Sequence, residues 1–249
     1  MTIDLNCDMG ELADAVLEQA LLRHITSANV ACGGHAGDAA SMRRTVDLAR
    51  RYGVAVGAHP GYPDRANFGR AAMPLTAAEI AATVAAQIRA LTEIAGRLTH
   101  VKPHGALYNV AAKDAAVARA IAEGVALAGG EVVLVGLAGS AMLDVWRDMG
   151  FGVAAEGFAD RRYEPDGSLR PRKLADALIT DPPQAAAQAL RLAQEGRVQS
   201  LCVHSDTPGS VEILAAVSEA LWLAGIAVSI IVLNNADPVI ERRDRADSP

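Results

Sequence analysis

Histidine side chains recur directly after short apolar runs along this chain. Four of the six histidines stand at such positions, His35, His59, His104 and His204, whereas His24 and His100 do not. Histidines with neighbouring carboxylates exchange protons near neutral pH and could act as general acid and base. The same groups could instead hold a divalent metal ion that activates water.

Carboxylate, amide and cationic side chains stand beside these histidines, at the ends of the same apolar runs. In parallel α/β folds the C-terminal ends of the strands share one mouth, so we expect these groups to meet there. Any single histidine could equally be a hydrogen-bonded residue at the rim, but a core would not gather so many ionisable groups without a function. The candidate site residues are Asn6, Asp8, Glu11, His35, Asp38, His59, Lys102, His104, Glu156, Arg161, Arg162, His204 and Asp206.

Lys102 is the most unusual of these residues. In the segment VKPHG its side chain would point into the fold or its mouth, where it needs a carboxylate partner or an anionic ligand. Acid-base chemistry without a metal could use Lys102, Arg161 or Arg162 to hold an anionic substrate group. No H-E-x-x-H motif and no tight histidine or cysteine cluster decides between the two chemistries. If a metal is bound, we expect Asp8, His35 and His59 to be its ligands.

Nucleophilic catalysis by serine or cysteine has weaker support. Cys7, Cys32 and Cys202 show no C-x-x-C spacing and are best interpreted as small buried hydrophobic residues. The G-x-S-x-G pattern is absent, and LAGSA at 137–141 suits a strand-to-helix turn. The P-loop pattern is absent as well.

Short β-branched runs alternate with alanine-rich helical segments, which is typical of βα units and a parallel sheet. A further run at 226–233 could be an eighth strand or a last piece packed against the edge. Helices are predicted to begin at Asp38, at Thr76 with Glu79, at Asp181-Pro182 and at Pro208-Gly209, and to end near Gly53, Gly96, Gly196 and Gly225. Seven strands are predicted, at 3–7, 28–32, 54–58, 98–103, 132–136, 152–156 and 201–204.

The regular order of strand and helix over 249 residues indicates one closed or nearly closed barrel. No linker or change in composition divides the chain, so residues 1–240 are expected to form one domain and the charged residues 241–249 to fray. An open doubly wound sheet is the alternative. It is less favoured because the dinucleotide fingerprint G-x-G-x-x-G does not follow the first strand.

The net charge and hydropathy of the chain restrict the kinds of partner that it could bind. The net charge of -6 argues against nucleic acid, which would need a clustered cationic surface. There is no 18-residue apolar span, and the N-terminus lacks a signal-peptide pattern. We therefore expect no membrane role and a cytoplasmic location.

Six segments resemble, in order, the signature segments of the LamB/YcsF family. They are IDLNCDMGE, ANVACGGHAGD, VGAHPGYPD with FGR, VKPHGALYN, AEGFADRRY and CVHSDTP, and they extend from residue 3 to residue 208. The resemblance implies an α/β fold, a distorted seven-stranded (β/α) TIM-like barrel similar to glycoside hydrolase and polysaccharide deacetylase barrels. Met9, Ser205 and the segment after residue 226 depart from the family pattern.

The resemblance also implies an activity. The family supplies one subunit of bacterial ATP-dependent 5-oxoprolinase, which converts 5-oxo-L-proline, ATP and water to L-glutamate, ADP and phosphate together with subunits B and C (PxpB and PxpC). Because this chain lacks a P-loop, we expect the partner subunits to bind ATP and activate the lactam, and this barrel to host ring opening.

On this hypothesis the residues divide into two groups. The catalytic acid-base set is Asp8, His59, His104 and Glu156, and the other candidate residues hold the substrate. Two alternatives remain open. The chain could be a metal-dependent amidase or deacetylase, or a non-catalytic subunit that binds a ligand.

Overall fold

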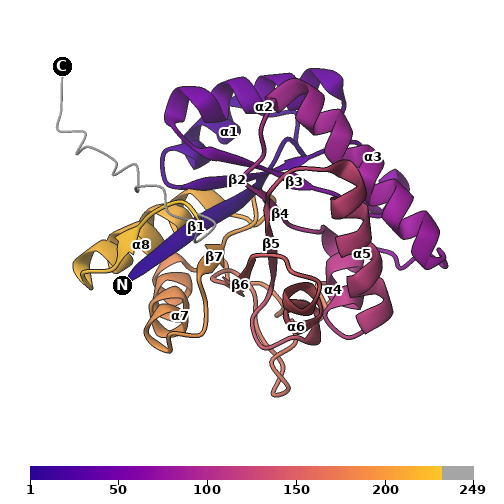
Figure 1. Ribbon diagram of the computed structural model, residues 1–249. Helices are drawn as coiled ribbons and strands as arrows, with labels where there is room; N and C mark the ends of the chain where they lie inside the picture. Colours follow the sequence, from indigo (N-terminus) through magenta and orange to yellow (C-terminus); the bar gives the residue numbers. More distant parts are fainter. Residues whose placement is uncertain (232–249) are drawn as a thin grey trace.

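Seven parallel strands close into a barrel that helices surround (Figure 1). The computed structural model describes residues 1–231. The barrel closes because β1 pairs with β7 on one side and with β2 on the other. The expected seven-stranded barrel is confirmed, and the open doubly wound sheet is excluded. The strands are β1 (Thr2–Met9), β2 (Ser27–Ala31), β3 (Ala55–His59), β4 (His100–Val101), β5 (Val133–Leu137), β6 (Val153–Phe158) and β7 (Ser200–Cys202).

Two strands end earlier than the sequence predicts, each for a local reason. The strand predicted at 98–103 stops at Val101, close before Pro103, which has no N–H to continue a ladder. The strand predicted at 201–204 stops at Cys202, and the N–H of His204 donates to the carboxylate of Asp160 instead. The groups that interrupt these strands therefore belong to the mouth of the barrel.

The apolar run near residue 226 contributes a short eighth strand, β8 (Ala227–Val228). It pairs in parallel with Thr2 and Ile3 at the start of β1 and is not a member of the closed ring. Residues 232–249 lie outside the described residues. They include the end of the run 226–233, the end of the predicted domain at residue 240 and the charged tail.

The four predicted helix starts are confirmed, and three of them carry side-chain capping bonds. The carboxylate of Asp38 accepts the N–H groups of Ala40 and Ser41, and Thr76 and Glu79 form a reciprocal capping box. None of the helices among residues 1–231 combines the length and apolar character needed to cross a bilayer. The α-helices in this part of the chain are α1 (Ala15–Leu22), α2 (Ala39–Tyr52), α3 (Ala77–Ala95), α4 (Gly105–Ala111), α5 (Ala115–Ala128), α6 (Ala141–Asp148), α7 (Pro182–Gln194) and α8 (Ser210–Leu223).

The sequence of β1 shows how the barrel wall separates two environments. Successive side chains of a strand point to opposite faces. Leu5, Cys7 and Met9 lie in the hydrophobic core between strands and helices. Asn6 and Asp8 alternate with them, are equally buried and make their hydrogen bonds across the barrel. The interior of this barrel is consequently polar.

Candidate active site

Hydrogen bonds fix the polar side chains inside the barrel below its mouth. The carboxylate of Asp4 accepts the hydroxyl groups of Thr26, Ser27 and Ser200 at 2.5 to 2.7 Å. Asn6 lies above Asp4 on the same face of β1 and donates to Ser200 Oγ at 2.7 Å. This network gives the next layer of side chains a rigid base.

Lys102 is the charged centre of that next layer. Its Nζ lies 3.0 Å from Asp8 Oδ1 and 2.9 Å from Glu156 Oε1, and it donates to Cys202 Sγ at 3.1 Å. The side chain is buried, so these two carboxylates meet the expectation that it needs a partner. Burial lowers the pKa of Lys102, but the charges of Asp8, Cys202 and Glu156 outweigh this and raise it well above its usual value. Lys102 therefore stays an ammonium ion.

Glu156 lies behind Lys102 and is completely buried. Its two oxygens accept Nδ2–H of Asn6 at 2.9 Å and the hydroxyl of Tyr108 at 2.8 Å. With Lys102 as third partner, the carboxylate has no free face toward a substrate. Glu156 balances the charge of Lys102 and holds it in place.

A second cluster joins three histidines to Glu11, which follows β1. Glu11 Oε1 lies 2.8 Å from His35 Nε2, 3.2 Å from His104 Nδ1 and 3.7 Å from His59 Nε2. The rings of His35 and His104 stack with their centroids 3.5 Å apart. Gly69 permits this approach, because a Cβ there would lie 2.6 Å from His35 Cβ.

Backbone carbonyl groups fix two of these rings. His59 Nδ1 lies 2.7 Å from Lys102 O, and His104 Nε2 lies 2.9 Å from Phe68 O. A carbonyl oxygen only accepts, so both of these nitrogens carry a proton. The remaining nitrogens, His59 Nε2 and His104 Nδ1, face each other at 2.9 Å.

The electrostatic surroundings of the histidines differ. Burial lowers the pKa of His35 to about 4 and also lowers that of His104. Burial acts in the same direction on His59, but Asp8 and Glu11 outweigh it and raise the pKa of His59. Of these three rings, His59 is therefore the one most readily protonated.

His204, which follows β7, forms a separate pair with Asp160. The carboxylate of Asp160 accepts the backbone N–H of His204 at 3.0 Å, its ring Nδ1–H at 3.0 Å and the hydroxyl of Thr207 at 2.5 Å. Burial raises the pKa of Asp160, but His204 and the other donors outweigh it and keep this pKa below its usual value. Because Nδ1 is the donor, Nε2 of a neutral His204 carries the free lone pair.

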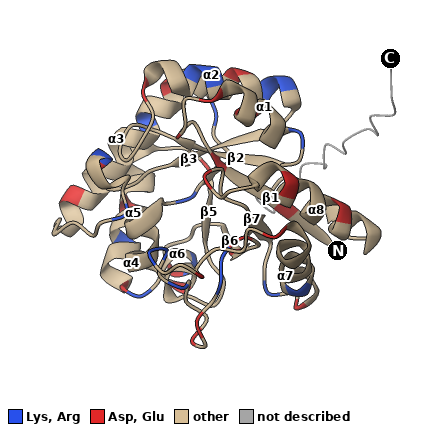
Figure 2. Ribbon diagram, turned by 180° about the vertical axis from the view of Figure 1, so that it is seen from behind, with Lys and Arg blue, Asp and Glu red and all other residues tan. Residues whose placement is uncertain are grey.

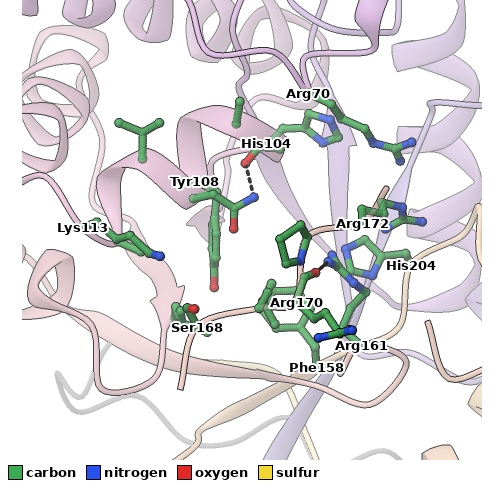
Figure 3. A pocket seen from close by; sticks show the side chains of 18 of the residues that line it. Arg70, His104, Tyr108, Lys113, Phe158, Arg161, Ser168, Arg170, Arg172 and His204 are labelled. Atoms are coloured by element: carbon green, nitrogen blue, oxygen red, sulfur yellow. Dashed lines mark hydrogen bonds between the residues drawn. The ribbon is translucent and has the colours of Figure 1, made fainter. Parts of the chain in front are cut away.

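A cavity of about 920 Å³ opens above these groups (Figure 3). Asp8, Lys102, His104 and His204 line it, whereas His59 and Glu156 are not among its lining residues. In Figure 3, Tyr108 and Lys113 lie on one side of the cavity, and the arginines and His204 lie on the other.

The loop between β6 and α7 supplies much of the cationic wall of the cavity. Figure 2 shows basic segments near β6. Arg172 and Arg70 both contact the carboxylate of Asp206. Arg161 is 5% exposed, and its Nη2 donates to Arg170 O at 2.7 Å. Among the described residues Arg161 has no carboxylate in ion-pair contact, and its buried Nε has no hydrogen-bond partner. Within residues 1–231, Arg161 is thus a buried guanidinium that no carboxylate neutralises by an ion pair.

Comparison with known proteins agrees with the fold and with the six sequence segments described above. The model described as LamB/YcsF family matches residues 3–235. The chain belongs to the LamB/YcsF family. A relative from Chloroflexus aggregans, named as the A subunit of 5-oxoprolinase, is 50% identical over 247 residues, which are 92% of this chain and 98% of the relative.

Solved structures extend the comparison of this LamB/YcsF chain. The lactam utilization protein from Thermus thermophilus is 40% identical, with a TM-score of 0.84 over 92% of this chain and 99% of that chain. The peptidoglycan deacetylase PdaC from Bacillus subtilis shares the fold, with 11% identity and a TM-score of 0.50 over 92% of this chain and 86% of that chain. The expected likeness to deacetylase barrels is therefore confirmed at the level of fold.

The structure brings most of the predicted site residues of this LamB/YcsF chain to the mouth. Two of them lie elsewhere. Asp38 is exposed and serves as the cap of α2, and Arg162 is exposed and does not line the cavity. Asp206 is at the mouth, but its carboxylate is engaged by two arginines.

Other residues of the site were not among the predicted ones. Asn29 lies in the middle of β2 and not at its end, where the site residues were expected. Its side chain donates to Asp8 Oδ1 at 2.9 Å. Arg70 and Arg172 stand in loops, where no periodic pattern marks them. Asp160 has a sequence signal, since it comes directly before the predicted Arg161 and soon after the end of β6.

Proposed function

We propose that this chain is the component of a 5-oxoprolinase in which the lactam ring of 5-oxo-L-proline is opened. The substrate is suggested by relatives that the chain covers almost completely and that are named as the A subunit of 5-oxoprolinase. One observation of the site carries the proposal. Among the described residues, a buried guanidinium without a carboxylate partner lines the same cavity as Asp8 and His204, which have a carboxylate oxygen and a ring nitrogen within 4.8 Å of each other.

Arg161 is the proposed anchor for the substrate carboxylate. Its planar guanidinium can bind a carboxylate with two parallel hydrogen bonds. Burial, followed by the charge of Arg172, lowers the pKa of Arg161, so an anion placed there would relieve repulsion between the two arginines. The anchor would orient the lactam so that its carbonyl faces Asp8 and Lys102.

Asp8 and His204 are the proposed acid-base pair. Both line the cavity, and a carboxylate oxygen of Asp8 lies within 4.8 Å of a ring nitrogen of His204. Asp8 would take a proton from water as the water oxygen bonds to the lactam carbonyl carbon. The C–N bond then breaks, and His204, once protonated, would supply the proton that the ring nitrogen needs as it leaves. When the lactam oxygen carries the phosphoryl group supplied by the partner subunits, breaking the C–N bond gives an acyl phosphate and a free amine. A second water then releases phosphate and leaves the carboxylate and the amine of L-glutamate.

Three members of the expected acid-base set take other positions in this scheme. Glu156 holds Lys102, whose ammonium ion would stabilise negative charge on the lactam oxygen. His59 and His104 each donate one ring N–H to a backbone carbonyl and turn the other nitrogen toward Glu11. In this scheme we assign the proton transfers to Asp8 and His204.

We propose that the partner subunits bind ATP and use it to activate the lactam. An unstrained lactam resists hydrolysis, and phosphorylation of its oxygen would create a better electrophile. This chain has no P-loop, so subunits B and C (PxpB and PxpC) are the proposed sites of ATP binding and activation. The cationic wall formed by Arg70, Arg161 and Arg172 would receive the phosphorylated lactam.

Reconstitution tests this proposal. The chain would be assayed for glutamate formation from 5-oxo-L-proline, with and without ATP, alone and mixed with the two partner subunits. We expect ATP-dependent turnover only in the mixture. Turnover by the chain alone at the rate of the mixture would refute the division of labour. ATP-independent hydrolysis of acetylated sugars or simple amides by the chain alone would favour an amidase or deacetylase instead.

A further inference from the structure

We propose that Glu11, His35, His59 and His104 form a binding site for one divalent transition-metal ion of the Zn²⁺ class. The donors would be one carboxylate oxygen and three imidazole nitrogens, a set that Zn²⁺ and its neighbours prefer. The four donor atoms lie within 4.8 Å of one another. The proposal concerns cation binding alone and does not depend on the proposed function.

The positions of protons on His59 and His104 provide the main argument. Hydrogen bonds to Lys102 O and Phe68 O place a proton on His59 Nδ1 and on His104 Nε2. In the neutral rings, His59 Nε2 and His104 Nδ1 therefore both carry lone pairs, and these two atoms are 2.9 Å apart. Two lone pairs at this distance repel, and either a proton on one of these nitrogens or a metal ion bound by both would relieve that repulsion.

The same carbonyl bonds are those of a metal site. A histidine that ligates a metal usually donates its other ring N–H to a carboxylate or a backbone carbonyl, which fixes the tautomer. His59 and His104 both show this arrangement. His35 lacks such a bond: its Nδ1 is buried without a hydrogen-bond partner, and its Nε2 lies 2.8 Å from Glu11 Oε1, so it would bind a metal through Nε2 only as the tautomer with its proton on Nδ1.

Four of the six distances between donor atoms are compatible with a single ion. Ligands about 2.1 Å from a metal lie about 3.0 Å apart at an octahedral edge and about 3.4 Å apart at a tetrahedral edge. The corresponding distances here are 2.9 Å between His59 and His104, 3.2 Å between His104 and Glu11, 2.8 Å between His35 and Glu11, and 3.7 Å between His59 and Glu11. They scatter around both values.

This set differs from the ligands expected from the sequence, which were Asp8, His35 and His59. Glu11 replaces Asp8, and His104 is added as a fourth ligand. Asp8 Oδ2 lies 3.3 Å from His59 Nε2, but its Oδ1 is held by Lys102 and Asn29. A second group with suitable spacing, Asp8, Cys202 and His204, already surrounds the ammonium ion of Lys102, which donates to both Asp8 and Cys202. The cluster around Glu11 is therefore the one we assign to the metal.

Metal titration of the chelator-treated full chain tests the site. Calorimetry with Zn²⁺ should show one equivalent bound, and Zn²⁺ should raise the thermal midpoint of unfolding. Glu11→Gln and His104→Gln should each weaken binding by at least about tenfold. His24→Gln, a histidine at the end of α1 outside the cluster, should bind like the unchanged chain. Absence of stoichiometric binding, or equal binding by all variants, would overturn the proposal.

Cobalt gives a second measurement that needs no variant. Co²⁺ in the proposed site would have only nitrogen and oxygen ligands, so its spectrum should show d–d bands without a thiolate charge-transfer band. A thiolate band that disappears in Cys202→Ala would assign the ion to the group around Lys102 and overturn the proposal. Because neither experiment uses 5-oxoproline, failure of the metal site is distinguishable from failure of the proposed function.

Discussion

Asp160 Oδ2 accepts both the backbone N–H and the imidazole Nδ1–H of His204, each at 3.0 Å. This pair orients the imidazole so that Nε2 is available for proton transfer. In the complex with its partners, His204→Asn should lower kcat for glutamate formation by about 100-fold or more, and Asp160→Asn should lower it by a smaller factor. Steady-state assays of both variants check this order. A His204→Asn enzyme with normal kcat would remove His204 from the chemistry.

Neighbouring arginines provide a matched test of substrate anchoring. Arg161→Gln should raise KM for 5-oxo-L-proline by about tenfold or more, because a bidentate carboxylate contact is lost. Arg162→Gln should change KM little, because the exposed Arg162 does not line the cavity. Similar KM values for the two variants would contradict the assignment of Arg161.

The contrast between Arg161 and Arg162 also shows what the sequence can predict. Asp8, Lys102 and His204 were predictable because parallel strands carry their C-terminal side chains to one mouth. Arg161 and Arg162 lie in an irregular loop, where sequence periodicity does not decide which side chain turns inward. Asp38 follows a strand as the others do, but its carboxylate is used by the cap of α2.

The sequence also could not predict how deeply each residue lies within the site. Glu156 ends a predicted strand as Asp8 does, but only contacts across the barrel, with Tyr108 and Asn6, place it beneath Lys102. Glu11 has no strand of its own, and its position among three histidines depends on how the loop after β1 folds. These contacts join segments that are far apart in the sequence, so they can be identified only from the closed barrel.

Lys102 should be a large determinant of stability. Lys102→Met removes the cation from two buried carboxylates, Asp8 and Glu156, and should lower the free energy of unfolding by about 3–5 kcal/mol. Glu156→Gln should cost less, since Lys102 then keeps Asp8 and the amide can still meet Tyr108. Urea denaturation of the three proteins measures these differences. A Lys102→Met chain as stable as the unchanged chain would contradict this account of the barrel interior.

His100 should make the fold sensitive to acid. Burial, followed by the charge of Lys102, lowers its pKa from 6.5 to about 3. The neutral ring binds Asn29 and Thr99, so its contribution to stability is complete above pH 6.5 and is lost as the pH falls toward 3. At pH 5 this loss is about 2 kcal/mol.

Denaturation of His100→Asn at pH 7 and pH 5 measures that contribution. The variant should be less stable than the unchanged chain at pH 7, but its free energy of unfolding should fall by about 2 kcal/mol less between the two pH values. An unchanged pH dependence would show that His100 does not titrate as the structure indicates.

Asp8→Asn in the reconstituted complex tests the central claim, that ring opening takes place at the mouth of this barrel. The measurement is the rate of glutamate formation from 5-oxo-L-proline with ATP, on variant chain that co-elutes with both partner subunits and unfolds cooperatively. The amide cannot accept a proton from water, so we predict that the rate falls by about 100-fold or more. A rate within about twofold of the unchanged complex would contradict the claim and place the chemistry elsewhere.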